Sequence, residues 1–501
     1  MVDAKLEGKE SEITQNVLAA EVFDRRGAFD PGSDPIVRIQ AGRVRRALEH
    51  YYLTHRDPGL VRIVLPKGTY VPVFLKGESP PPFDQTGSLT GDGPTDSGVP
   101  VIVVCPFANL TGNANFDYVV RGLPMHIAVE ADRTRDARIL VSPVDLIESA
   151  GSKNRERYMG LSSSFCLRGA LRTDKADFVL DVQLVRCATN RQIWANEFQH
   201  SQPKTDVATF LAGAARRVAL MVLNEGGILY RNQIRQLPSV PNSHSSTHEA
   251  VLWYLAWQVA PDPEIFTTVV ANLQEAVQRD PRSGIAKSFL ARCYADLWAL
   301  DFEGVSIRIE DALDLALAGL DCNPDDCRAN GIVAYVYLVM DDIETALQYA
   351  ETALSRARGS FLFMDGISYL LTLCGDWERG PALLQKVLKG NPFHAAYVHG
   401  ALWVEAMRCE DYPAARRAAM AAGASSNFWG PLMRCVALAH LGDMAAATAQ
   451  SKELLLFKPK FAERGDWLIR RYVKDDATVA SVKKGLALAG LNVHAPPPDN
   501  L

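Results

Sequence analysis

The residues best suited to bind a ligand lie near the N-terminus, where basic side chains gather in an otherwise acidic chain. The whole sequence has a formal net charge of -5. Between residues 35 and 77, however, eight Lys and Arg residues stand against two acidic ones, a local balance of +6. The basic residues are Arg38, Arg43, Arg45, Arg46, Arg56, Arg62, Lys67 and Lys76, and the acidic ones are Glu49 and Asp57. Such a patch favours contact with phosphate groups or with an acidic protein surface.

The first part of this segment is predicted to be a helix that separates apolar from basic positions. Ser33 or Asp34 can cap its N-terminus, and Pro35 suits its first turn. Arg43 and Arg46 lie opposite its apolar side on a helical wheel. The apolar residues recur at helical spacing and are expected to form one buried face: Val37, Ala41, Val44, Leu48 and Tyr51.

A short basic hairpin is predicted directly after this helix, because VRIVLPKGTYVPVF reads as two strands around Pro66, Lys67 and Gly68. A supporting helix, a basic helix and a β-wing form a winged helix-turn-helix. VRIQAGRVRRAL, residues 37–48, resembles the recognition helix of the OmpR/PhoB-type DNA-binding domain, which also occurs in CadC and ToxR regulators. EITQNVLAAEVFDR, residues 12–25, resembles the supporting helix before it. The family's four-stranded N-terminal sheet is missing, and the wing is shorter than usual.

The resemblance implies that the helix enters the major groove of duplex DNA while other residues contact the phosphate backbone. The positions that it makes DNA-binding are Arg38, Gln40, Gly42, Arg43 and Arg46 in the helix, and Lys67 and Thr69 at the wing tip. Two other interpretations stay open. The basic helix could dock on an acidic surface of the same chain, such as residues 344–351, or it could be a solvated face.

The strongest pattern in the sequence is an internal repeat in the C-terminal half. Aspartates recur at 342, 376, 411 and 443, with spacings of 34, 35 and 32 residues. Pro324, Pro392 and Pro459 stand about two repeats apart. A small residue follows each aspartate by four positions: Ala346, Gly380, Ala415 and Ala447. The pattern resembles the tetratricopeptide repeat family, which implies about five to six helical hairpins over residues 245–490 and a bound protein or peptide partner.

Residues 99–236 alternate strand and helix signals and predict a small α/β domain. Strands are expected at 101–105, 138–141, 165–172, 178–187 and 192–198, and helices at 116–131 and 205–232. The opening of this region resembles the TolB N-terminal or FlgO-like domain, although Arg121 stands where that family commonly has an acid. The matching positions are Pro106, Phe107, Asn109, Asn113, Tyr118, Gly122 and Leu123.

Together these patterns predict a multidomain α and α/β protein. Its N-terminal winged-helix-like domain covers residues 1–78, and a flexible linker rich in proline and glycine covers 79–98. The α/β domain covers 99–236, and an all-α tetratricopeptide solenoid covers 245–490. The charged N-terminus and the lack of a long apolar run predict a cytoplasmic location and no membrane partner.

No catalytic chemistry is expected from the motifs. Walker, G-x-S-x-G, H-E-x-x-H and dinucleotide-binding patterns are absent from the sequence, so neither an enzyme nor a cofactor is predicted. His244 and His248 have helical spacing but lack a convincing third metal ligand, and Cys322 and Cys327 read as structural thiols. The sequence therefore predicts a non-enzymatic bacterial regulator that binds DNA. The alternatives are a repeat scaffold without DNA binding, or the regulatory partner of a signalling enzyme such as an adenylate cyclase.

Overall fold

The computed structural model describes the chain in segments, and every structural statement below concerns these residues. They are 1–6, 8–9, 13–22, 37, 41, 44, 61–65, 69–76, 99–131, 137–142, 164–174, 177–201, 207–224, 226–238, 245–259, 263–302, 307–357, 363–391, 394–423 and 427–494. Contacts divide the chain into two units, Met1–Thr95 and Asp96–Leu501. The division falls in the predicted linker, residues 79–98, which lies outside the described residues.

Among its described residues, the first unit contains two short helices, a β-hairpin and three separate helical positions, 37, 41 and 44. The helices are α1 (Val2–Leu6) and α2 (Gln15–Val22), and the strands are β1 (Val61–Val64) and β2 (Val73–Lys76). The strands pair antiparallel, with Val61 opposite Lys76 and Val64 opposite Val73. The hairpin and the helix within residues 12–25 are therefore confirmed, although the second strand begins only at Val73 and ends at Lys76, two residues beyond the predicted stretch.

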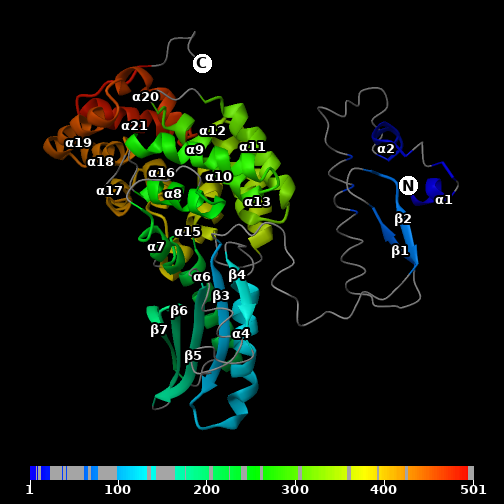
Figure 1. Cartoon of the computed structure of the whole chain (residues 1–501). Helices are drawn as coiled ribbons and strands as arrows, with labels where there is room; N and C mark the ends of the chain where they lie inside the picture. The colour runs from blue at the N-terminus through cyan, green and yellow to red at the C-terminus, as the bar shows by residue number, and fades with distance from the viewer. Residues whose placement is uncertain are drawn as a thin grey trace. The chain divides into compact units, whose positions relative to one another are not determined.

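The second unit opens with a five-stranded mixed sheet in the order β4-β3-β5-β6-β7 (Figure 1). Its strands are β3 (Val101–Asn109), β4 (Arg138–Val141), β5 (Ser164–Asp174), β6 (Asp177–Arg186) and β7 (Arg191–Ser201). β3 pairs parallel with β4 and β5, and β5, β6 and β7 pair antiparallel. Every predicted strand of this region is confirmed, with bounds shifted by a few residues.

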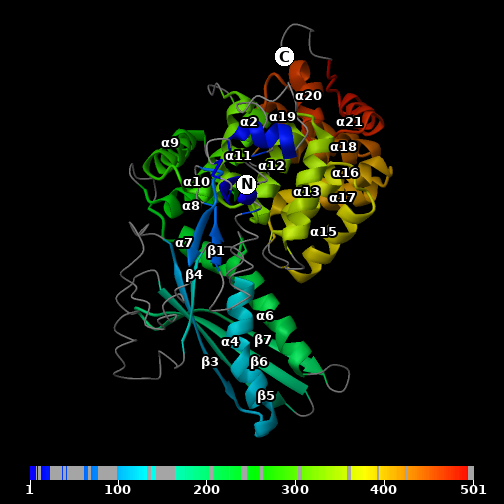
Figure 2. The same cartoon turned by 90° about the vertical axis from the view of Figure 1, so that its right-hand side faces the viewer.

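Helices α4 (Asp117–Ala131) and α6 (Val207–Leu223) pack together and cover one face of the sheet (Figure 2). Alternate strand residues such as Val104, Leu167 and Leu180 face these helices and form a single apolar core. A short 3-10 helix, η2 (Ala114–Phe116), precedes α4. The stretch Val207–Ile234 is long enough to span a membrane, and its most apolar 18 residues have a mean hydropathy of 1.3. However, 61% of those 18 residues are buried inside the fold.

The predicted helix over residues 205–232 is wrong in one respect, because it is broken into α6 and α7 (Ile228–Ile234). Gly227 precedes α7, and a Cβ atom there would lie 2.8 Å from the carbonyl oxygens of Met221 and Asn224. Only glycine fits this close approach of the backbone. The break lets α7 contact β7 on one side and the first helix of the following array on the other.

The rest of the second unit is a helical array. Consecutive helices pair as hairpins: α8 (Thr247–Val259) with α9 (Pro263–Arg279), α10 (Gly284–Ala299) with α11 (Ile309–Cys322), and α12 (Cys327–Val339) with α13 (Ile343–Ala357). The series continues with α14 (Met364–Leu373) and α15 (Arg379–Gly390), α16 (His399–Arg408) and α17 (Tyr412–Ala421), α18 (Trp429–His440) and α19 (Met444–Phe457), and ends with α20 (Phe461–Arg470) and α21 (Asp476–Leu488). A 3-10 turn, η3 (Ala396–Val398), precedes α16.

The repeated aspartates act at the turns inside four consecutive hairpins, from α12 and α13 to α18 and α19. At the end of α12 the amide of Asp342 donates to the carbonyl of Tyr337 at 3.0 Å, and Asp341 adopts a left-handed φ of 72°. The Asp342 carboxylate then accepts a hydrogen bond from the Thr345 amide at 3.1 Å and caps α13. The equivalent carboxylate caps follow in the next three hairpins: Asp376 to Arg379, Asp411 to Ala414 and Asp443 to Ala446.

The small residues after these turns lie where two helices cross closely. Ala346, Ala415 and Ala447 are each 0% exposed. At Gly380 a Cβ atom would lie 2.5 Å from the hydroxyl oxygen of Thr372 on the partner helix. The predicted tight crossings are therefore confirmed. Of the three prolines that predicted inter-repeat turns, Pro324 and Pro459 lie in turns, and Pro392 is outside the described residues.

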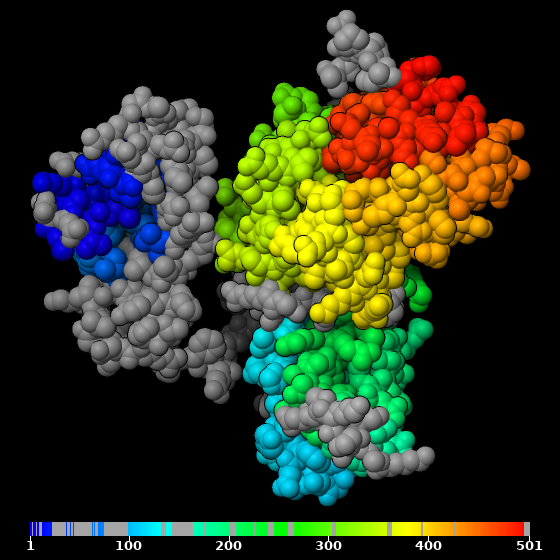
Figure 3. All heavy atoms as spheres, turned by 180° about the vertical axis from the view of Figure 1, so that it is seen from behind, coloured from blue at the N-terminus to red at the C-terminus, as the bar shows by residue number. Residues whose placement is uncertain are grey.

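The array does not end as an open stack, because its last hairpin folds back on earlier helices. α21 packs on α16 and α18, while the residues between α20 and α21 reach α10 and α12. In Figure 3 the red C-terminal helices lie against both the light-green and the orange parts of the array. The hairpin buries many apolar side chains at 1% exposure or less: Phe461, Leu468, Ile469, Val473, Val479, Val482 and Leu486.

Candidate functional site

Most of the predicted DNA-binding residues fall outside the described residues. These are Arg38, Gln40, Gly42, Arg43, Arg46 and Lys67. Thr69 is described and lies between β1 and β2, where its hydroxyl accepts a hydrogen bond from the Val71 amide at 3.1 Å. That bond fixes the chain locally as it enters the second strand.

The framework beneath the basic helix is described in part. Val37 and Ala41 are helical and buried, at 2% and 5% exposure, and their spacing of four residues places them on one side of a helix. Val37 packs with Leu18 and Ala19 of α2. Val44 was also expected on the buried face. That prediction is wrong, because Val44 is helical but 39% exposed. The buried side of the helix is therefore narrower than the sequence pattern indicates.

A second candidate site is a partly buried polar group centred on Asp296 of α10. Its carboxylate accepts hydrogen bonds from the Tyr254 hydroxyl at 2.5 Å and from the Tyr335 hydroxyl at 2.8 Å. The Gln258 amide donates to the same carboxylate at 3.2 Å. Because the Tyr335 proton goes to Asp296, the Tyr472 hydroxyl is the donor in its 2.8 Å contact with Tyr335. The group thus joins α8, α10 and α12 to the turn before α21.

Burial sets the protonation of this group. It raises the pKa values of Tyr254 and Tyr335 well above the usual range, so both hydroxyls remain donors at any physiological pH. Neither tyrosine is therefore suited to act as a base. The arrangement positions helices rather than transferring protons, and no sequence pattern predicted it.

A cation completes the contact between the C-terminal turn and the array. The guanidinium of Arg471 lies 3.9 Å from the ring centre of Trp298 in α10 and 4.0 Å from that of Trp467 in α20. It also donates to the carbonyl of Val339, at the end of α12, at 2.7 Å. Burial lowers the pKa of Arg471 to about 10, which still leaves the side chain charged near neutral pH.

Ion pairs hold the same region at its edges. Lys474 pairs with Asp341 at 2.8 Å, and Lys458 pairs with Asp301 at 2.9 Å. Asp341 and Asp301 are the left-handed residues that end α12 and α10. The residues between α20 and α21 therefore cover part of α10 and α12.

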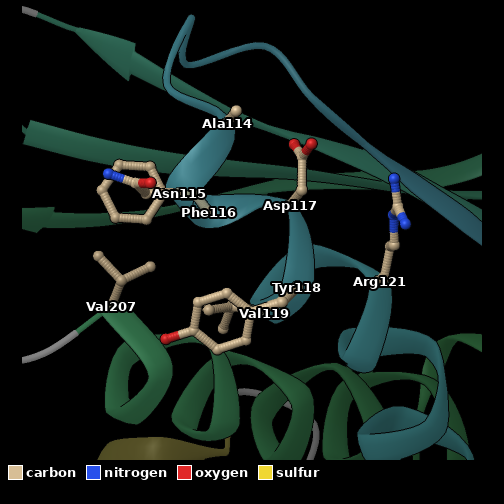
Figure 4. A pocket seen from close by; sticks show the side chains of 8 residues that line it. All are labelled: Ala114, Asn115, Phe116, Asp117, Tyr118, Val119, Arg121 and Val207. Atoms are coloured by element: carbon tan, nitrogen blue, oxygen red, sulfur yellow. The ribbon is translucent and has the colours of Figure 1, made fainter.

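A shallow recess of about 910 Å³ lies at the start of α4 in the sheet domain (Figure 4). The loop before it is ordered by Asn109, whose amide donates to the Asp117 carboxylate at 2.6 Å and whose oxygen accepts from Thr111 at 2.7 Å. The recess is lined by Ala114, Asn115, Phe116, Asp117, Tyr118, Val119, Arg121 and Val207. The asparagines that the sequence singled out thus shape the loop, and Tyr118 is 74% exposed beside it.

The described residues give no support to a metal site or a thiol site at the histidines and cysteines that the sequence singled out. Within the described segments no group of three or more His, Cys, Asp or Glu side chains could hold a metal ion. His244 is outside those segments, and His248 is buried next to Tyr230. Burial lowers the pKa of His248 to about 4. Cys322 and Cys327, at the end of α11 and the start of α12, are both free thiols.

Comparison of the chain with protein-family models and with curated proteins finds no match.

Proposed function

We propose that this chain is a non-enzymatic bacterial regulator that acts in the cytoplasm and binds duplex DNA through a winged helix in its N-terminal unit. The observation that carries the proposal is a helix whose Val37 packs with Leu18 and Ala19 of α2 and whose Ala41 is buried, followed in the chain by an antiparallel β-hairpin. A helix buried on that side leaves the sequence positions of Arg43 and Arg46 on the opposite side of the helical wheel. That is the arrangement a recognition helix requires.

The helical array is proposed to be a tetratricopeptide solenoid that binds a protein or peptide. Support comes from the repeated turn, in which an aspartate amide closes one helix and its carboxylate caps the next. Since α21 packs on α16 and α18, and Arg471 and Tyr472 before it contact α10 and α12, the partner is expected on surfaces that this hairpin leaves free. The sheet domain is proposed to be of the TolB N-terminal or FlgO-like class, on the strength of its strand order and its asparagine-rich loop.

The DNA-binding proposal is tested with the full chain by measuring affinity for a pool of genomic duplexes over a range of salt concentrations. Phosphate contacts release counterions, so log affinity should fall with log salt at a slope of roughly -0.9 per contact. Three to five contacts are expected from the basic residues of the helix and the hairpin. The double variant R43A/R46A should lose ~1–3 kcal/mol for each arginine that reaches a base edge.

The matched control is R416A/R417A, which removes two exposed arginines from α17 in the other unit. It changes the net charge equally and should leave both affinity and slope unchanged. If the full chain shows no salt-dependent affinity for any duplex, or if both double variants weaken binding alike, the DNA-binding proposal fails. The chain would then be better explained as a repeat scaffold that does not bind DNA, or as the regulatory partner of a signalling enzyme such as an adenylate cyclase.

A further inference from the structure

Three cysteines share the face of the sheet opposite to α4 and α6. Cys105 of β3, Cys166 of β5 and Cys187, directly after β6, pack in one buried cluster with Val101 and Val103. Cys166 is 1% exposed and Cys187 is 6% exposed. Since strand residues alternate between faces, these thiols are separate from the core that the two helices cover.

The strand register brings two of these thiols together. The amide of Cys187 donates to the carbonyl of Ser164 at 3.0 Å, so Cys187 extends the antiparallel pairing of β5 and β6 by one residue. Cys166 and Cys187 are therefore diagonal neighbours on the same face of the sheet. Cys166 lies within β5, and Cys187 is the first residue after β6.

The two sulfur atoms lie 2.7 Å apart. Non-bonded carbon atoms already prefer a separation of about 3.5–4.0 Å, and sulfur is larger. A disulfide bond has a length of about 2.05 Å. The two sulfur atoms are therefore in direct contact, with no other side chain between them.

We propose that Cys166 and Cys187 are a site of reversible oxidation by hydrogen peroxide and form a disulfide bond across β5 and β6. One thiolate attacks a peroxide oxygen, the O–O bond breaks, and a sulfenic acid and, after proton transfer, one water are formed. The second thiol attacks the sulfenic sulfur, the S–S bond forms, the S–O bond breaks, and a second water leaves. Two thiols are oxidised, and the peroxide is reduced to two waters.

The pair lies beside the contact between the sheet and α7. Arg186, next to Cys187, donates to the side-chain oxygen of Asn232 in α7 at 2.7 Å. Its guanidinium also lies 5.1 Å from the ring centre of Phe165, the neighbour of Cys166. A covalent bond between Cys166 and Cys187 restricts the motion of their neighbours Phe165 and Arg186, which hold the sheet against α7. Oxidation is therefore expected to slow hydrogen exchange in β5, β6 and α7.

The test uses the full chain carrying Cys322→Ser and Cys409→Ser, which removes the two exposed thiols. The reduced protein is treated with hydrogen peroxide, denatured, alkylated and analysed by mass spectrometry after digestion. The expected result is a peptide pair linked through Cys166 and Cys187, with two fewer alkylated cysteines, and recovery of both thiols with dithiothreitol. Adding Cys187→Ser should abolish the link.

Cys105→Ser is the matched control, since it alters a thiol of the same cluster and should retain the link. Circular dichroism establishes that each variant is folded. The loss of two of the nine thiols in the unsubstituted chain, located by mass spectrometry, gives a readout that needs no variant at all. Full alkylation of Cys166 and Cys187 after oxidation, or a link from either one to Cys105, would overturn the proposal.

Discussion

Replacing Asp296 by alanine should destabilise the helical array far more than the loss of one surface charge would. Both carboxylate oxygens accept hydrogen bonds, from Tyr254, Gln258 and Tyr335. A hydrogen bond to a charged group contributes about 1.5–3 kcal/mol, and a buried donor left without an acceptor costs about 1–3 kcal/mol. Since two tyrosine hydroxyls lose their acceptor, we expect Asp296→Ala to lower the free energy of unfolding by ~3–5 kcal/mol.

The measurement is urea unfolding of the full chain followed by circular dichroism, together with hydrogen exchange of α8 and α12. Asp296→Asn keeps an acceptor of the same shape and should lose about half as much, since it removes the charge but not every bond. Asp314→Ala, at an exposed position of α11, is the control and should stay within about 0.5 kcal/mol of the parent. A loss below about 1 kcal/mol for Asp296→Ala, with unchanged exchange in both helices, would refute the reasoning.

Three further outcomes are expected. Ala415→Leu should cost ~1–3 kcal/mol by overpacking a fully buried crossing, whereas Leu at exposed Ala421 should not; equal urea midpoints would contradict the assigned crossing. Asp443→Ala should cost ~1 kcal/mol through loss of the α19 cap, and Asp443→Asn should restore most of it in the same assay. Burial lowers the pKa of His248 to about 4, so as pH falls from about 6.5 to 4 the unfolded chain takes up a proton that the folded chain does not. Stability should fall by about 3 kcal/mol over that window, and His248→Phe should flatten that part of the melting-temperature profile; parallel profiles would show that His248 is not responsible.

The sequence revealed the repeat because each defining residue acts locally. Asp443, for example, closes α18 through its amide and caps α19 through its carboxylate, and all of its partners lie within five residues. Such a residue must recur wherever the turn recurs, so its spacing is visible without knowledge of the fold. The strand β3 was visible for a similar reason, since it opens with a compact apolar run, Val101–Cys105.

The folded-back hairpin was invisible because its contacts join residues with no local pattern. Tyr335 and Tyr472 are 137 positions apart, and nothing near either one marks it as a partner of the other. Repetition also favours the expectation of an open stack, in which a hairpin touches only its neighbours. The break before α7 was easier to predict from the sequence, since Gly226 and Gly227 interrupt the helical pattern and would have justified a helix boundary there.

The return of the last hairpin onto α10 and α12 has a consequence for the synthesis of the protein. Tyr472 leaves the ribosome 137 residues after Tyr335, and Lys458 follows Asp301 by 157 residues. At about 5–20 residues per second, the unfinished array therefore waits roughly 7–30 s for the helices that cover it. During that interval Trp298 and the apolar side chains beside it lack their final partners. A nascent chain of this kind is expected to depend on chaperones, and a product that stops before α20 should be recognised as misfolded even though most of its hairpins are complete.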